Sequence, residues 1–359
     1  MSNEVYHKLA RVLDTLPNGF PATESGVEIR LLKKVFEPDE AKIFCDLRLS
    51  FETAAQIALR KGIPVDGLEE KLNSMWNRGQ VMGVDFGTVK LFRMMPWIFG
   101  IYEFQLNRLD REFVEMFEEY SPTFSKVLMG HKPQLMQVLP IEKEIPNRQE
   151  ALPYQLVSAI IDKGQSFAVA DCICKKEKGL MDHHCIHPLE VCLGIAPLPG
   201  YFDNNHWGRP ISREEAYGIL RKSEESGLVH LTNNVESDHF FICNCCGCCC
   251  GVLRTINEMG MTDVVNSQYY ARIDPDYCSA CGVCKDERCP IGAIENGEET
   301  YRVNRERCIG CGLCVTTCPS EAISLVLKEP ADRQTPPKNE KAWFKERGRQ
   351  RGVDFSAFE

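Results

Sequence analysis

Eight cysteines between Cys278 and Pro319 constrain the fold of this chain more than any other feature. They form two runs that repeat at an interval of 30 residues, and each run reads Cys-x2-Cys-x2-Cys followed by a Cys-Pro pair. The first run contains Cys278, Cys281, Cys284 and Cys289, and the second contains Cys308, Cys311, Cys314 and Cys318. A cubane of iron and sulfide has four iron corners, and each corner needs one thiolate. The two runs therefore predict two [4Fe-4S] clusters.

The fourth cysteine of each run is expected to bind the other run's cluster, because it cannot reach back across its own short loop. We assign one cluster to Cys278, Cys281, Cys284 and Cys318, and the other to Cys308, Cys311, Cys314 and Cys289.

A pair of zinc ribbons is the alternative, since Cys-x2-Cys also binds zinc. Two triple-cysteine runs that each end in Cys-Pro favour iron and sulfide. The first run has four residues before Cys289 where three are usual, so the loop there must bulge.

The region 269–327 resembles bacterial-type two-cluster ferredoxins beyond the cysteines themselves. Pro290-Ile-Gly-Ala-Ile294 in the first half corresponds to Pro319-Ser-Glu-Ala-Ile323 in the second, and short strand-like runs flank both halves. The resemblance implies the two-cluster ferredoxin fold for this part of the chain.

Length, charge and cysteine usage limit the remaining possibilities. The 359 residues are enough for two or three domains, and an α+β, multidomain chain is expected. Nineteen cysteines, an odd number concentrated after residue 171, suit metal sites in a reducing compartment better than a disulfide framework. There is no basic stretch followed by an apolar core at the N-terminus and no apolar run of about 18 residues, so a cytoplasmic protein without a membrane span is expected. The net charge of −9 suits a basic redox partner better than nucleic acid.

Residues 1–138 are predicted to form a winged-helix-like docking domain. A capping box of Thr53 and Gln56 begins a helix that Gly62 ends, a second helix spans residues 66–78, and two strand-like runs surround Asp85-Phe-Gly87. The exposed face of the second helix carries Asp66, Glu69 and Glu70, which would repel phosphate. We therefore expect protein docking, or a homo-oligomer formed through this domain, and no specific binding of nucleic acid. A further helix from Asn107 to Glu119 is expected to end before Pro122.

Residues 139–268 are predicted to form a cysteine-rich α/β module in which strands deliver the thiols. The first set is Cys172, Cys174, Cys185 and Cys192, which could complete one cubane, or one zinc site given His183, His184 and His187 nearby. The second set is Cys243, Cys245, Cys246, Cys248, Cys249 and Cys250, and no structural zinc site needs six thiols in eight residues. Cys245 and Cys246, or Cys248 and Cys249, are expected to serve different clusters, or one cluster and a free thiol, because adjacent cysteines point to opposite sides of an extended backbone. One or two further iron-sulfur clusters, or one zinc, are therefore expected here. His206 and Trp207 are assigned to a packed loop.

Three parts of the chain together resemble a group of anaerobe iron-sulfur proteins with an N-terminal winged-helix-like domain and a C-terminal two-[4Fe-4S] ferredoxin domain. These parts are residues 16–105, the motifs Asp171-Cys-Ile-Cys174 and Cys243-Asn-Cys-Cys-Gly-Cys-Cys-Cys-Gly251, and the ferredoxin region. The resemblance implies iron-sulfur cofactors rather than a particular reaction.

Residues 328–359 are expected to form an extended tail, either disordered or holding a partner with its basic and aromatic side chains.

Missing motifs narrow the choice of function. The chain has no Gly-x-Gly-x-x-Gly after a strand, no Walker loop and no Cys-x3-Cys-x2-Cys run. A chain with clusters and no two-electron cofactor moves single electrons, so we expect an electron-transfer component rather than a stand-alone enzyme. Its partners would be a flavoprotein, a dehydrogenase or a reductase. The alternatives are a redox-responsive winged-helix regulator and a reductase whose central cluster binds substrate.

Overall fold

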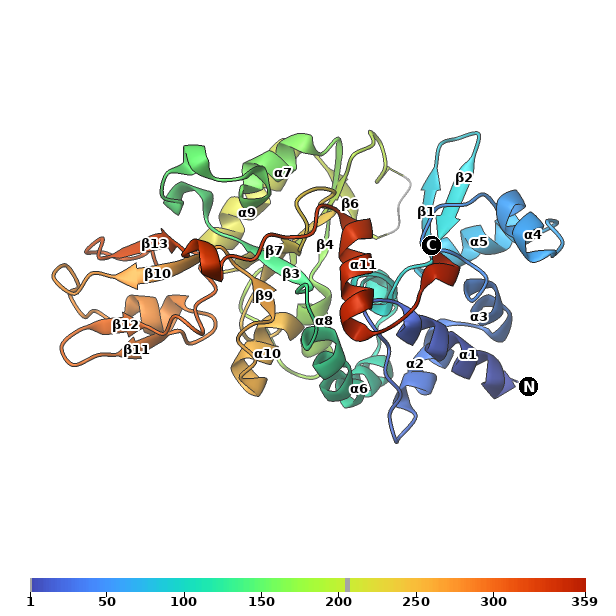
Figure 1. The fold of residues 1–359 in the computed structure, drawn as a ribbon, viewed down its shortest axis with the longest axis horizontal. Helices are drawn as coiled ribbons and strands as arrows, with labels where there is room; N and C mark the ends of the chain where they lie inside the picture. Colours follow the sequence, from blue (N-terminus) through green and yellow to red (C-terminus); the bar gives the residue numbers. More distant parts are fainter. Residues whose placement is uncertain (1, 204–206) are drawn as a thin grey trace.

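The computed structural model describes residues 2–203 and 207–359, so His206 lies outside the described residues. Three regions follow one another along the long axis of the molecule, and the mixed helix and sheet class agrees with the expected α+β fold (Figure 1). A helical N-terminal region lies at one end, a seven-stranded sheet lies in the middle, and the ferredoxin region forms the other end. Both termini lie at the end formed by the N-terminal region.

The N-terminal region combines helices with one small hairpin. Its helices are α1 (Ser2–Thr15), α2 (Val27–Val35), α3 (Pro38–Phe44), α4 (Ala54–Lys61), α5 (Leu68–Asn77) and α6 (Arg111–Met129). The hairpin consists of the antiparallel strands β1 (Met82–Asp85) and β2 (Lys90–Arg93). Thr53 begins α4 with the reciprocal bonds of a capping box, as predicted, and Leu68, Leu72 and Met75 bury one face of α5.

Helix α6 continues through Pro122, so the predicted helix end before this proline was wrong. A proline inside a helix removes a backbone hydrogen bond and costs about 3 kcal/mol. The apolar face of α6 runs past the proline, because Phe117, Tyr120 and Phe124 are all buried and the rings of Tyr120 and Phe124 stack 5.3 Å apart. Burial of this aromatic face offsets the missing hydrogen bond.

The central sheet has the strand order β6-β4-β5-β8-β7-β3-β9, and all neighbouring pairs are antiparallel except β3 with β9. Its strands are β3 (Met136–Leu139), β4 (Ser166–Asp171), β5 (Glu190–Ala196), β6 (Arg209–Ile211), β7 (Val229–Asn233), β8 (Phe241–Cys245) and β9 (Val265–Asn266). The first strand of this sheet already begins at Met136, so the expected domain boundary after residue 138 falls inside β3.

Helices cover both faces of this sheet. Helices α7 (Val157–Lys163) and α9 (Arg213–Glu225) share a core with Val169, Leu193 and Ile242 on one face. Helices α8 (Ile173–Leu180) and α10 (Gly251–Met259) share a second core with Ala170 and Phe241 on the other face. Side chains alternate between the two faces along each strand. Cys243 and Cys245 therefore share the α8 and α10 face with Phe241.

The ferredoxin region contains two short two-stranded sheets. Strands β10 (Tyr269–Ile273) and β13 (Ile323–Leu327) pair antiparallel, as do β11 (Ile294–Asn296) and β12 (Tyr301–Val303). The extra residue before Cys289 is accommodated by a π-helical turn over Cys284–Arg288, in which the Cys289 amide donates to the Cys284 carbonyl at 3.1 Å. A π-turn takes up one residue more than an α-turn, so the predicted bulge is confirmed.

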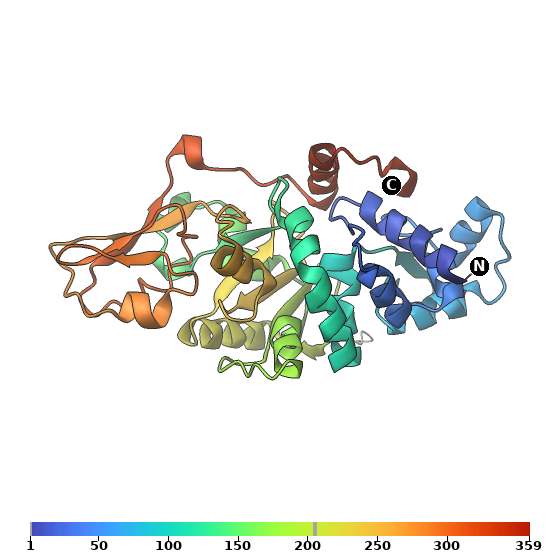
Figure 2. The ribbon, with the colours of Figure 1, turned by 90° about the horizontal axis from the view of Figure 1, so that it is seen from below.

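The tail is extended only in part. Residues 333–338 run along the central region, where Pro337 and Lys338 carbonyls accept backbone N–H bonds from Glu236 and Ser237. Helix α11 (Glu340–Arg351) follows and packs beside the N-terminal region, which differs from the extended arm expected for residues 328–359 (Figure 2). The tail thereby connects the two ends of the molecule.

Arg347 anchors helix α11. Its side chain is fully buried, and its guanidinium donates to the carbonyl oxygens of Leu128, His131 and Pro133. Trp343 adds a bond from Nε1 to the Gln134 carbonyl at 2.9 Å. All these acceptors lie at the end of α6 or in the connection to β3, so the tail fixes that connection.

We predict that Arg347→Met lowers the free energy of unfolding by about 3 kcal/mol, because buried carbonyl groups lose a charged donor. Arg349→Met is the matched control on the same helix, since the Arg349 side chain is 69% exposed and should shift stability by about 0.5 kcal/mol or less. Anaerobic denaturant titration followed by fluorescence measures both variants. Equal midpoints for the two variants would contradict the anchoring role.

Candidate metal centres

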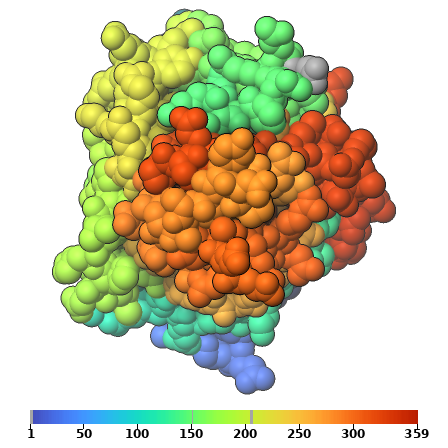
Figure 3. Space-filling model, turned by 90° about the vertical axis from the view of Figure 1, so that its left-hand side faces the viewer, coloured from blue at the N-terminus to red at the C-terminus, as the bar shows by residue number. Residues whose placement is uncertain are grey.

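Two pockets in the ferredoxin region are each lined by four cysteines. One is lined by Cys278, Cys281, Cys284 and Cys318, and the other by Cys289, Cys308, Cys311 and Cys314. These are the crossed sets that the spacing predicts, since each pocket combines three cysteines of one run with the last cysteine of the other. The region forms one end of the molecule, where its surface faces outward beside the central region (Figure 3).

The surroundings of both pockets suit thiolates that bind the positively charged iron-sulfide core of a cluster. The amide of Ala293 donates to the Cys289 sulfur at 3.1 Å, and the amide of Ala271 donates to the Cys308 sulfur at 3.3 Å. Burial raises the pKa of Cys311 to about 12 and that of Cys284 to about 11. Such thiols lose their protons only when positive charge compensates them, as the irons of a cluster would. The donor sets therefore fit [4Fe-4S] clusters.

Six further thiols form one connected group in the central region, which we call the six-thiol chamber. Its members are Cys172, Cys174, Cys192, Cys243, Cys245 and Cys250. Each thiol is in hydrogen-bond contact with the next in the order 192, 243, 245, 250, 174 and 172. Strands β5 and β8 supply three of them, and the beginnings of α8 and α10 supply the others. The chamber thus lies between the sheet and these two helices.

Two helix N-termini point their positive ends at the chamber. Cys172 is the N-cap of α8 and Cys250 is the N-cap of α10. The backbone amides of Lys175 and Leu253 favour the thiolate forms of these two cysteines. The pKa of Cys172 nevertheless lies well above its usual value, because of its hydrogen bond with Cys174 and its burial. A chamber of charged thiolates therefore needs compensating cations.

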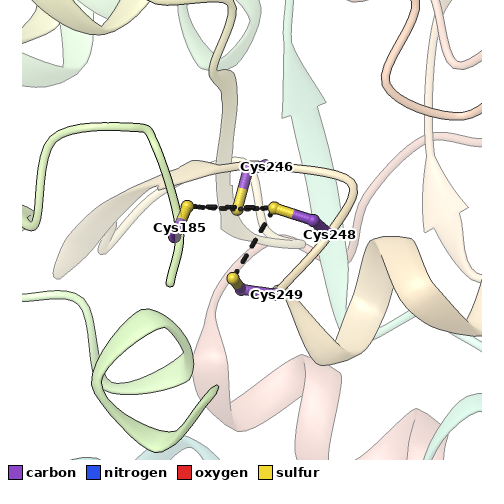
Figure 4. A group of neighbouring side chains, drawn as sticks. All are labelled: Cys185, Cys246, Cys248 and Cys249. Carbon is purple, nitrogen blue, oxygen red and sulfur yellow. Dashed lines mark hydrogen bonds between the residues drawn. The ribbon is translucent and has the colours of Figure 1, made fainter. Parts of the chain in front are cut away.

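The remaining four thiols of this region form a separate, compact group, which we call the four-thiol group. It consists of Cys185, Cys246, Cys248 and Cys249, whose sulfur atoms all lie within 4.8 Å of one another (Figure 4). Cys185 comes from the loop between α8 and β5, and the others come from the turn between β8 and α10. The pKa of Cys246 is lowered, mainly because hydrogen bonding with Cys249 stabilises its thiolate.

The structure groups these cysteines differently from the sequence analysis. Cys185 joins the turn after β8 instead of forming one set with Cys172, Cys174 and Cys192. Cys245 and Cys246 belong to different groups, as expected for neighbours on an extended strand, but Cys248 and Cys249 share one group because the chain turns there. The four-thiol group contains only cysteines, and the neighbouring His183 and His184 are exposed.

Several acidic side chains near the chamber were missed from the sequence. The Tyr102 hydroxyl donates to the carboxylate of Glu177, and burial raises the pKa of Glu177. Burial also raises the pKa of Glu103 to about 8. Charge on Glu177 acts on Cys174, and charge on Glu103 acts on Cys192. Tyr102 and Glu103 belong to the N-terminal region, and only the tertiary fold brings them here.

A close backbone contact joins the ferredoxin region to the central region. Gly247 lies so near Pro290 that a Cβ atom at position 247 would collide with the Pro290 carbonyl oxygen. The Asn257 side-chain amide bridges the two segments, donating to the Pro290 carbonyl at 3.0 Å and to the Gly247 carbonyl at 3.2 Å. Gly247 lies between two members of the four-thiol group, and Pro290 follows Cys289 directly. The contact therefore connects two cysteine sites.

Comparison with known proteins gives matches for parts of this chain. The family described as "4Fe-4S binding domain" matches residues 301–324. An uncharacterized ferredoxin of Methanocaldococcus jannaschii is 35% identical over 85 residues, which are 23% of this chain and 49% of that protein. The electron transport protein HydN of Escherichia coli K12 is 39% identical over 54 residues, which are 14% of this chain and 31% of HydN.

A third match is one component of an ion-translocating oxidoreductase complex of Methanosarcina acetivorans, with 44% identity over 48 residues, 13% of this chain and 18% of that component. The aligned stretches span less than half of each of these three relatives. The chain therefore contains an iron-sulfur domain of the ferredoxin type. Among the residues that the structure describes, no helix has both the length and the apolar character for crossing a membrane.

We predict that Gly247→Ala separates the ferredoxin region from the central region, because the added methyl group displaces Pro290. Amide hydrogen exchange should rise in residues 246–250 and 288–292. Gly251→Ala is the control, since no heavy atom lies within 4 Å of the added Cβ at that position. Unchanged exchange at both segments in Gly247→Ala would disprove the contact.

Proposed function

We propose that this chain is an electron-transfer protein or subunit that passes single electrons through iron-sulfur clusters between redox partner proteins. The observation that carries the proposal is the pair of pockets lined by crossed sets of four cysteines. Each pocket takes one [4Fe-4S] cluster, with three ligands from one run and the fourth from the other. The ferredoxin, the electron transport protein and the oxidoreductase component that match part of this chain support the same function.

We infer that the six-thiol chamber holds a further iron-sulfur cluster in series with the ferredoxin pair. Four of its six thiols suffice for one cubane, and its two helix N-termini favour a negatively charged cluster. The chamber is also close to the ferredoxin region along the chain, because Cys245 lies two residues before Gly247, which contacts Pro290 beside Cys289. An electron entering at either end therefore has a short protein path to the next site.

We propose a docking role in a reducing, cytoplasmic compartment for the N-terminal region. Helices α4 and α5 and the β1–β2 hairpin follow one another in the order of a winged helix. Asp66, Glu69 and Glu70 are exposed on and before α5, and the nearby Lys71 is paired with Asp39 at 2.6 Å. Such an acidic face repels phosphate, so a basic protein surface is the better partner and no observation favours the regulator.

The first test concerns crossed ligation. We predict that Cys289→Ser removes the cluster held by Cys308, Cys311 and Cys314, although Cys289 belongs to the first run. Anaerobic iron and sulfide analysis should show the loss of one cluster, and electron paramagnetic resonance of the reduced protein should show loss of the interaction between two clusters. Cys278→Ser is the matched control and should remove the other cluster. Identical spectra for the two variants would refute the crossed assignment, and zinc without sulfide in the parent protein would refute the function.

The second test concerns the chamber. Cys243 is in contact with both Cys192 and Cys245, and a variant in which these three are all replaced by serine keeps only three chamber thiols, too few for one cubane. It should lose the iron and sulfide that exceed the ferredoxin pair while leaving the ferredoxin signals intact. Cys45→Ala is the control, because Cys45 is buried in the N-terminal region and belongs to no metal-binding group among the residues that the structure describes. If the triple variant retains all iron and sulfide of the parent protein, the chamber holds no cluster.

A further inference from the structure

We propose that the four-thiol group binds a single zinc ion in a closed tetrahedral site, and that this ion holds the turn on which the ferredoxin region docks. The site is composed of Cys185, Cys246, Cys248 and Cys249. It is distinct from both ferredoxin pockets and from the six-thiol chamber. The proposal goes beyond electron transfer, because zinc has no redox chemistry in proteins and serves here as a structural link.

The sulfur distances match one metal ion. A tetrahedral zinc ion with bonds of about 2.3 Å to sulfur separates its ligands by about 3.8 Å. The Cys185 sulfur lies 3.7 Å from that of Cys246 and 3.8 Å from that of Cys248. Cys248 lies 3.4 Å from Cys246 and 3.6 Å from Cys249, measured between sulfur atoms. All four thiols are free, and these separations are too long for disulfide bonds.

A cubane does not fit the same four sulfur atoms. Each cysteine of a cubane binds a different iron, so its sulfur atoms lie farther apart than the ligands of one ion. The ferredoxin pockets provide the comparison within the same molecule. Within residues 2–203 and 207–359, only the four-thiol group brings its metal-binding atoms within 4.8 Å of one another. The ferredoxin sets surround wider spaces, as a cluster requires.

The charge of the site is partly balanced by the fold. Four thiols release four protons on binding zinc, so the complete site carries a charge of about −2. Lys175 is 3% exposed, and its charge acts on Cys246 in the direction that favours the thiolate. Its ammonium group is held by the Pro188 carbonyl at 2.6 Å. The charge of this buried, fixed ammonium group partly offsets the negative charge of the proposed zinc site.

The positions of the four ligands indicate a structural role for the ion, namely joining the loop of Cys185 to the turn after β8. Cys185 lies in a loop without helix or strand, 61 residues before Cys246, and the ion would join these two segments. Gly247 lies between the ligands Cys246 and Cys248, so both neighbours of the residue that contacts Pro290 are held by the metal. Loss of zinc should therefore loosen the docking of the ferredoxin region.

The test uses the full chain, purified without oxygen and analysed for metals. We expect about one zinc ion per chain in addition to iron, with four sulfur neighbours at about 2.3 Å by X-ray absorption at the zinc edge. Cys185→Ser and Cys248→Ser should lose the zinc, keep the iron and sulfide, and increase amide exchange in residues 246–250 and 288–292. Cys45→Ala should keep zinc, iron and the parent exchange pattern.

Three results would overturn the zinc site. The first is a parent protein without zinc in which Cys185→Ser loses iron and sulfide, which would assign the group to a cluster. The second is zinc that remains bound in both cysteine variants. The third is a disulfide among the four residues, found by thiol labelling and mass spectrometry of the anaerobic protein. The outcome is independent of the ferredoxin clusters, whose iron and electron paramagnetic resonance signals are measured on the same samples.

Discussion

A buried thiolate needs compensating positive charge, and this requirement organises most of the molecule. Eighteen of the nineteen cysteines belong to the two ferredoxin pockets, the six-thiol chamber or the four-thiol group, and Cys45 is the remaining one. Burial and mutual contact raise the pKa of many of these thiols, so the apoprotein would hold them protonated. The fold supplies part of the compensation through backbone amides, helix N-termini and the buried Lys175. Metal ions would supply the rest, and on the proposed function the folding of these regions would be coupled to metal binding.

The cysteine run after residue 242 is divided by simple backbone geometry. Alternation along β8 directs Cys243 and Cys245 to the face shared with α8 and α10. The chain then turns, so Cys246 and Cys248 leave the sheet and meet Cys185, while Cys250 returns to the chamber as the N-cap of α10. Six thiols in eight residues thus serve two sites of different size. The extended strand and the turn that follows it are enough to direct neighbouring cysteines to the two different sites.

Local patterns predicted much of this structure, and long-range contacts account for what they missed. The crossed ferredoxin sets and the bulge before Cys289 follow from spacing, because ligand loops are short. The partner of Cys185 lies 61 residues away, and no spacing rule reaches that far. The predicted helix end before Pro122 was wrong because burial of the aromatic face of α6 outweighs the tendency of proline to end a helix. Helix α11 was missed for a similar reason, since it has no clear apolar periodicity and its anchor is a buried arginine, Arg347.

The three regions are joined closely enough that none is an independent unit attached by a flexible linker. The segment after β2 brings Tyr102 and Glu103 to the chamber, and Phe99 contacts Phe241 on β8 with ring centroids 4.6 Å apart. If the chamber holds the proposed cluster, a partner that displaced the N-terminal region would alter the electrostatic surroundings of the chamber thiols and the reduction potential of that cluster. On these proposals the docking region and the electron path would be coupled, because Tyr102 and Glu103 of the N-terminal region lie beside the chamber thiols.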